Sequence, residues 1–276
     1  MAAIDVNRRV LPGFGLSLGY TLFYMGLVVM VPMVAGFLKA ADLSLGEFWD
    51  AVSSERAVAA YTLTVGASLV SALVNVVLGS LVAWVLVRYE FPLKGLLDSL
   101  VDFPFALPTA VAGLVFSALF VENGWYGRFL VPLGIEGAYS RLGIVLVLVF
   151  IGFPFVVRTL QPVIEGLQRD VEEAAACLGA SRLQTVVRVT LPAVLPAIVT
   201  GFALAFARSL GEYGSVVFIS GNMPFRTEIA PVLIVARLEE FAYAEAAAIA
   251  VVLLAISFTT LFAINLLERW MARHHA

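Results

Sequence analysis

Six apolar stretches without a charged side chain constrain this chain more than any other feature. They cover residues 11–38, 57–87, 103–121, 142–157, 189–207 and 246–267. A helix needs about 20 mostly apolar residues to cross a bilayer, and lipid admits only helices or closed barrels. These stretches are too long for barrel strands, which need about 10 residues. With 61% hydrophobic and 13% charged residues, the sequence predicts an all-α polytopic membrane protein with six transmembrane helices.

Two of the apolar regions are irregular. Pro104 and Pro108 predict a bent start to the third span, because proline interrupts a helix. Residues 213–225 are uncharged and rich in Gly, Ser, Asn and Pro, too short and too broken to span alone. Such a segment either lines a cavity as re-entrant structure or folds over the bundle as an outer loop.

The distribution of Lys and Arg sets the expected orientation, since cytoplasmic loops carry an excess of positive charge. With the N-terminus inside, ten cations lie in inner segments and seven in outer ones. The inner set is Arg8, Arg9, Arg88, Lys94, Arg158, Arg169, Arg182, Arg188, Arg269 and Arg273, and the outer set is Lys39, Arg56, Arg128, Arg141, Arg208, Arg226 and Arg237. Both termini and the segment around residue 180 are therefore expected in the cytoplasm. Arg158 is expected to extend toward the inner interface, and Asp98 and Asp102 to cap or pair there.

A polar island at residues 173–192 separates two apolar stretches. It begins with Glu173, Ala174 and Ala175, reaches Gly179 six residues after the glutamate, and ends at Leu191 and Pro192. The slim alanines favour a short helix that can enter a groove on a partner. Gly179 permits a sharp bend or a close backbone approach. Pro192 is typical of the first turn of a helix.

The pattern from Glu173 to Pro192 resembles the EAA loop of ABC-type import permeases, which docks into a separate ATPase. Nearly the whole chain resembles one subgroup, the T-type permease of bacterial sulfate/thiosulfate ABC importers. The stretches that carry this second resemblance are residues 9–14, 102–114, 153–159, 208–214 and 237–241. Val186 and Val187 stand where the EAA helix often has an aromatic residue, and both remain apolar.

The resemblance implies an ABC type I importer permease fold and a four-part assembly in the bacterial inner membrane. Its expected partners are a related W-type permease, two copies of a cytoplasmic ATPase and a periplasmic sulfate-binding protein, with lipid around the helices. ATP and Mg²⁺ would bind to the ATPase, and no cofactor is expected on this chain. The sequence has no Gly-x-x-x-x-Gly-Lys-Ser/Thr phosphate loop, so ATP hydrolysis by this chain itself is not expected.

Arg208, Glu212 and Gly214 are the candidate residues of a pathway or gate. Arg208 and Glu212 are four residues apart, so on a helix they share a face and can pair. Charges at membrane depth are functional candidates by default, although a purely structural ion pair near the outer boundary is the alternative.

Other classes of protein fit less well. An ion-coupled carrier or channel usually places several acidic or His side chains inside its spans, and these spans hold almost none. Only Cys177 and the terminal His274 and His275 could supply thiol or imidazole chemistry, so an enzyme or a metal site is not expected. The net charge of −3 does not favour nucleic acid. Within the same class, a molybdate or tungstate permease working as a homodimer remains the alternative.

The expected division of the chain has three parts. Residues 1–56 form an N-terminal transmembrane helix and an outer linker. Residues 57–268 form the ABC type-1 transmembrane core, with the coupling loop at about 170–192. Residues 269–276 form a cytoplasmic tail.

Overall fold

The computed structural model describes the backbone of residues 14–274 and the side chains of residues 14–168 and 170–266. All regular structure in this part of the chain is helical, which confirms the all-α class. Five segments are long and apolar enough to cross a membrane: Phe14–Ala40, Glu55–Arg88, Arg141–Glu165, Arg182–Leu210 and Tyr243–Leu266. The predicted inner residues Arg8 and Arg9, and residues 275–276 of the predicted tail, lie outside the described residues.

Four predicted spans correspond closely to long helices. The second is α4 (Glu55–Arg88) and the sixth lies in α15 (Tyr243–His274). The uncharged part of the fourth span is too short to cross a bilayer by itself. Residues on both sides of it continue the helix, so that α9 (Arg141–Glu165) has 25 residues. The fifth begins earlier than predicted, because α11 (Arg182–Thr185) and η3 (Val186–Thr190) run into α12 (Leu191–Leu210) without a break.

The first span and the fifth each contain a π-helical turn just before a proline. α1 (Phe14–Met25) continues through a π-helical turn, η1 (Gly26–Met30), into α2 (Val31–Ala40). In both spans the residue just before a proline donates its amide to a carbonyl five residues back: Val31 to Gly26, and Leu191 to Val186. The wider turn removes the clash between the proline ring and the preceding carbonyl. Pro192 thus lies in the first turn of α12, as predicted, within a longer helical run.

The predicted third span is not one helix. α5 (Lys94–Val101) leads to the four residues of α6 (Phe103–Ala106), and α7 (Thr109–Phe120) follows with 12 residues. Leu107 is extended, with φ −87° and ψ 127°, because a residue that precedes proline disfavours the α region. The bend predicted from Pro104 and Pro108 is confirmed, and it divides the stretch 103–121, so five helices of the described chain, and not the predicted six, are long enough to cross a membrane.

The core is a three-helix packing of α4, α9 and α12. The face of α4 that is buried in it carries small and polar side chains at helical spacing: Thr64, Ser68, Ser71 and Asn75. Small residues allow membrane helices to approach closely, and hydroxyls can bond across them. Ser71 Oγ lies 3.3 Å from Ser209 Oγ of α12, so this polar stripe joins two of the three helices.

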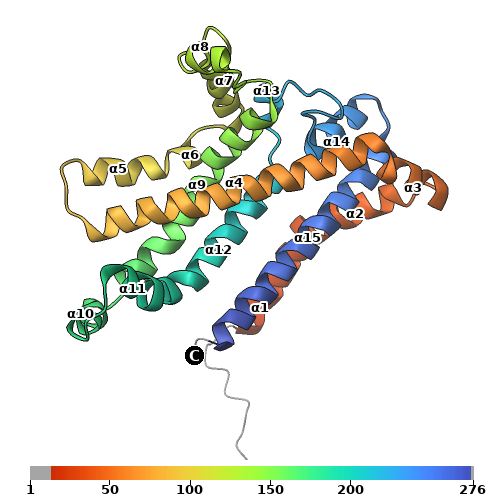
Figure 1. Cartoon of the computed structure of the whole chain (residues 1–276). Helices are drawn as coiled ribbons and strands as arrows, with labels where there is room; N and C mark the ends of the chain where they lie inside the picture. Colours follow the sequence, from red (N-terminus) through yellow and green to blue (C-terminus); the bar gives the residue numbers. More distant parts are fainter. Residues whose placement is uncertain (1–13, 275–276) are drawn as a thin grey trace, which may run out of the picture.

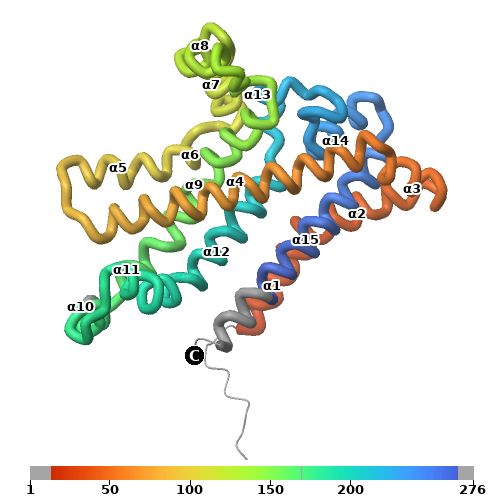
Figure 2. Tube along the Cα trace, viewed as in Figure 1, coloured from red at the N-terminus to blue at the C-terminus, as the bar shows by residue number. Residues whose placement is uncertain are grey.

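The arrangement has two distinct ends (Figure 1). α10 (Arg169–Cys177) and α11 lie at the lower end, where α1 begins and α15 finishes. The opposite end carries α3 (Leu45–Ser53), α8 (Gly127–Leu130) with η2 (Val131–Leu133), α13 (Val216–Ile219) and α14 (Ala230–Glu239). The trace shows α4 turning back into α5, α6 and α7 (Figure 2). We call the end with α10 and α11 the coupling end, and the end with α13 and α14 the gate end.

Candidate functional site

The predicted coupling loop is a helix, a tight turn and a second helix. α10 contains Glu173, Ala174 and Ala175. It ends in a Schellman motif, in which the Ala180 amide donates to the Ala175 carbonyl (3.0 Å) and the Gly179 amide to the Ala176 carbonyl (2.9 Å). Gly179 has φ +81°, and a Cβ there would meet nothing within 4 Å. Of the two roles considered for this glycine, the structure selects the bend.

The second helix begins at a capping box that the sequence analysis missed. Ser181 Oγ accepts from the Gln184 amide, and the Gln184 side chain accepts from the Ser181 amide. A serine followed three residues later by glutamine is a recognisable signal for a helix start. The Schellman motif and the capping box together define the loop from both sides, so its shape depends on local sequence.

The loop projects from the bundle (Figure 1). Glu173, Ala174 and Cys177 are exposed, and Leu178 keeps 89% of its surface. Leu191 is also exposed and Pro192 is half-buried. An apolar tip beside exposed alanines is the surface that a docking helix requires, since burying it against a partner is favourable.

One ion pair within the described side chains connects α10 to the bundle. The Arg88 guanidinium at the end of α4 donates to Glu172 Oε1 at 2.6 Å. Arg88 also lies over the Trp84 ring, 5.0 Å from its centroid. The analysis singled out Glu173, but the neighbouring Glu172 makes the contact. The two partners are 84 residues apart in sequence, and no local pattern joins them.

The candidate gate residues Arg208 and Glu212 do pair. Arg208 Nη1 donates to Glu212 Oε2 at 2.6 Å. Glu212 lies beyond the end of α12, so the pair closes the turn that follows the helix instead of lying on one helical face. Glu212 keeps 3% of its side-chain surface and Arg208 34%. The other carboxylate oxygen of Glu212 accepts from the amide and the hydroxyl of Ser215, at 2.9 and 3.0 Å.

Backbone packs against backbone where the turn meets α7. A Cβ on Gly214 would lie 2.3 Å from Thr109 Oγ1, and one on Gly113 would lie 2.2 Å from the Ser215 carbonyl oxygen. One turn further on, Ser117 Oγ donates to the Phe218 carbonyl at 2.8 Å. The broken third span and the irregular stretch 213–225 are therefore one packed unit, in which Ser215, Val216, Ile219 and Ser220 are fully buried. Sequence alone showed that both segments are irregular but not that they contact each other.

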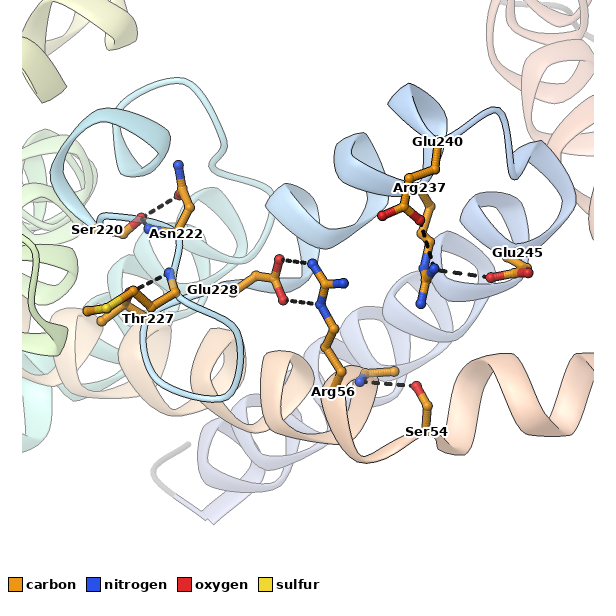
Figure 3. Close-up of polar contacts among 11 residues, drawn as sticks. Ser54, Arg56, Ser220, Asn222, Thr227, Glu228, Arg237, Glu240 and Glu245 are labelled. Carbon is orange, nitrogen blue, oxygen red and sulfur yellow. Dashed lines mark hydrogen bonds and ion pairs between the residues drawn. The ribbon is translucent and has the colours of Figure 1, made fainter.

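A polar network fixes the segment after α13 to α4 (Figure 3). Arg56 donates two 2.7 Å bonds to the two carboxylate oxygens of Glu228, which keeps 3% of its surface. The Ala230 amide donates to Thr64 Oγ1 at 2.8 Å. Nearby, Ser220 Oγ donates to Asn222 Oδ1 at 2.6 Å, and Arg237 binds Glu240 at 2.8 Å. Bidentate arginine pairs are among the strongest polar contacts, so this end is firmly held.

A second network lies at the far end of α9. Arg158 donates to Asp98 Oδ1 (2.7 Å) and to both oxygens of Asp102 (2.8 and 2.6 Å), and Gln161 also donates to Asp98. The predicted pairing of Asp98 and Asp102 is confirmed, and their partner is Arg158. This network anchors α5 and α6, the start of the broken span, to α9. Among the described residues no group of His, Cys, Asp or Glu could hold a metal ion.

Comparison with known proteins identifies the family. Residues 75–273 match the model for the binding-protein-dependent transport system inner membrane component. The sulfate transport system permease protein CysT of Salmonella typhimurium is 49% identical over 97% of this chain and 96% of its own, and that of Escherichia coli is 48% identical over the same shares. The corresponding protein of Synechococcus elongatus is 50% identical over 93% of this chain and 92% of its own.

The fold agrees with that relationship. A bacterial ABC transporter involved in the import of alginate superposes with a TM-score of 0.75 at 19% identity, covering 92% of this chain and 94% of its own. The MetNI methionine ABC transporter gives a TM-score of 0.59 at 17% identity, covering 83% and 99%. With the family model matching most of the chain, this protein belongs to the binding-protein-dependent transport system inner membrane components, the permeases of ABC importers.

Proposed function

We propose that this chain is the permease subunit of an ATP-driven importer and forms part of the path for sulfate or thiosulfate. Relatives at about half identity over nearly the whole chain are named sulfate permeases, which favours sulfate over the molybdate or tungstate alternative. The observation that supports coupling is the exposed α10–α11 hairpin, whose tip projects away from the bundle (Figure 1). The proposed ATPase contacts are Glu173, Ala174, Ala175, Gly179, Leu191 and Pro192.

The assembly that fits this role has four kinds of subunit. A related W-type permease would complete the membrane path, two copies of an ATPase would bind the coupling loops, and a periplasmic binding protein would deliver the anion. ATP and Mg²⁺ belong to the ATPase, and this chain is a non-enzymatic membrane subunit. ATP-driven closure of the ATPases would move the docked hairpins and bias the helices between inward-open and outward-open states.

The proposed topology has six crossings with both termini in the cytoplasm. α6 and α7, with the end of α5, would make the third crossing as a broken helix supported by α9 and α13. Ion pairs that connect distant elements support this arrangement of crossings, because each joins groups predicted on one side. The assignment of one side to the cytoplasm rests on the Lys and Arg distribution. Arg56 binds Glu228 at the predicted outer face, whereas Arg88 binds Glu172 and Arg158 binds Asp102 at the inner one. The division into residues 1–56, 57–268 and 269–276 is kept with this topology.

Arg208, Glu212 and Gly214 are the proposed gate. Pairing nearly neutralises the Arg208 and Glu212 charges, so a dianion that passes would be neither trapped nor repelled strongly. Gly214 lets the turn that holds Glu212 approach Thr109 of α7. A movement of α7 would therefore reach the ion pair directly.

Cys177 tests the coupling assignment, because it is exposed and is the chain's single thiol. A membrane-impermeant maleimide should label it in inside-out vesicles but not in intact spheroplasts. Labelling should slow several-fold when the ATPase is added. Efficient labelling from the periplasmic side, or labelling that the ATPase does not affect, would contradict the proposal.

Gene deletion tests the substrate. Cells without the protein should lose ATP-dependent uptake of labelled sulfate and require cysteine or another reduced sulfur source. Molybdoenzyme activity at low molybdate should persist. If sulfate uptake persists in a strain without a redundant importer while molybdoenzyme activity fails, the molybdate alternative is correct.

A further inference from the structure

Two surface pockets meet at Trp84 near the coupling end of α4. One is an apolar groove of about 470 Å³ between α4, α9 and the η3–α12 segment. The other is a polar pocket of about 450 Å³ between the end of α4 and α10. Trp84 lines both, so the two pockets are adjacent across this one side chain, and we call the pair the amphipathic groove. Each part is within the range of about 300–1,000 Å³ that is usual for ligand pockets.

The apolar part is shaped to hold a hydrocarbon chain. Its walls are mostly aliphatic: Val77 and Leu81 of α4, Leu160 and Ile164 of α9, and Val194 and Ile198 of α12. Val77 lies seven residues before Trp84, a distance of about 10 Å along a helix. That length covers most of one leaflet's hydrocarbon, which is about 15 Å deep.

The polar part carries charges of both signs. Arg88, Tyr89, Glu172 and Glu173 line it. Arg88 binds Glu172, but its buried Nε has no hydrogen-bond partner. Glu173 is exposed and makes no ion pair with a described side chain. The pocket therefore offers donors from one cation and oxygens from two carboxylates, close to the two aromatic rings of Trp84 and Tyr89.

We propose that this groove binds a phosphatidylethanolamine-type phospholipid of the inner leaflet. The phosphate would contact Arg88, the ammonium would donate to Glu172, and one acyl chain would lie along Val77 and Leu81. Trp and Tyr favour the headgroup level of a membrane, which places Trp84 and Tyr89 correctly. An anionic headgroup would meet two carboxylates without a compensating ammonium. A choline headgroup has no N–H to donate.

The bound lipid would supplement the one ion pair between described side chains that connects α10 to the bundle. A headgroup between Arg88 and the carboxylates of α10 adds contacts at the loop that the ATPase is proposed to move. The assignment to the inner leaflet rests on the proposed topology. Lipid composition would then affect how tightly the coupling hairpin is held, with no change at the gate end.

The test is lipid retention by the purified importer complex. After delipidation, native mass spectrometry with added phosphatidylethanolamine, phosphatidylcholine and phosphatidylglycerol should show the first retained at least about fivefold better. Ser80→Phe, which fills the apolar part, should abolish this preference, whereas Leu78→Phe, at an exposed position of the same helix that lines neither pocket, should preserve it. Arg88→Gln should reduce retention several-fold, and Lys94→Gln, outside both pockets, should not.

Three outcomes would overturn the proposal. They are equal retention of the three lipids, full retention in Ser80→Phe, and a cross-link from Leu81 that shows a second permease covering the groove. The assay reads binding and needs no transport, so the two proposals fail separately. A complex that imports sulfate without retaining the lipid refutes only the lipid site, and one that retains the lipid without import refutes only the function.

Discussion

The two ends of this permease are built on opposite principles. At the gate end, Glu212 and Glu228 are buried carboxylates whose oxygens are all bonded, and the backbone of the turn lies directly on α7. At the coupling end, α10 is exposed and one described ion pair, Arg88 to Glu172, connects it to α4. Contacts among several elements fix the structure of the gate end, whereas local turn and capping signals fix that of the coupling end.

The difference indicates where motion can originate. Low-stability elements with few buried contacts open and shift most easily, and moving parts are drawn from them. The coupling hairpin keeps its own shape through Gly179 and Ser181. Its helix α10 is held to α4 by one described ion pair, whereas α11 continues into α12. A partner that moves α10 could therefore transmit the movement through the fixed turn to α12. The gate end can respond only if α7, α13 and α14 move together, because their contacts are shared.

The largest expected effect is at the backbone contact of the gate end. Gly113→Ala would place a Cβ 2.2 Å from the Ser215 carbonyl oxygen, and a backbone atom cannot rotate away. We expect a loss of about 3 kcal/mol, the upper range for overpacking, and a Tm lower by about 5–10 °C. Thermal aggregation of the purified permease measures it. Gly66→Ala is the matched control, since nothing lies within 4 Å of its Cβ. Equal effects of the two changes would contradict the tight contact.

At the coupling end a glycine substitution should uncouple the importer without unfolding it. Gly179 needs φ +81° but has open space around its Cβ. Valine disfavours this left-handed conformation, whereas asparagine tolerates it. Gly179→Val should therefore insert normally and lose sulfate uptake, and Gly179→Asn should keep most of it. The measurements are uptake and co-purification with the ATPase. Normal uptake by the valine variant would show that the turn is not needed for coupling.

The sequence predicted what depends on local pattern. Apolar length located α4, α9, α12 and α15, proline placed the bend before α7, and spacing predicted the pair of Arg208 with Glu212. It could not predict the pairs Arg56–Glu228 and Arg88–Glu172, whose members are 172 and 84 residues apart. Those contacts follow from how the helices pack. The packing of α13 and α9 against α7 could likewise not be predicted, because it joins segments that are distant in the sequence.

The buried pair at the gate end should respond strongly to loss of one partner. Arg56→Gln leaves the Glu228 carboxylate buried without its cation, and we expect a cost of about 3 kcal/mol. Changing both, as Arg56→Gln with Glu228→Gln, should recover much of this loss because no buried charge remains. Lys39→Gln, which breaks the exposed pair with Asp42, is the control and should cost at most about 1 kcal/mol. The test compares the Tm of the unchanged protein, Arg56→Gln, the double variant and Lys39→Gln. A double variant as unstable as Arg56→Gln would contradict the argument.

The smallest expected effect concerns the charge balance of the proposed gate and is read in transport. Arg208→Ala leaves Glu212 unpaired, although Ser215 still donates to one of its oxygens. The uncompensated negative charge should repel a dianion and reduce sulfate uptake about tenfold, which corresponds to about 1.4 kcal/mol. Adding Glu212→Gln removes that charge and keeps an oxygen for Ser215, so the double variant should transport better than Arg208→Ala alone. A purely structural pair predicts the same Tm loss but no such recovery of uptake. The measurement is the initial uptake rate of Arg208→Ala, Glu212→Gln and the double variant at matched protein levels. If the losses of the two single variants simply add in the double variant, the two side chains act independently.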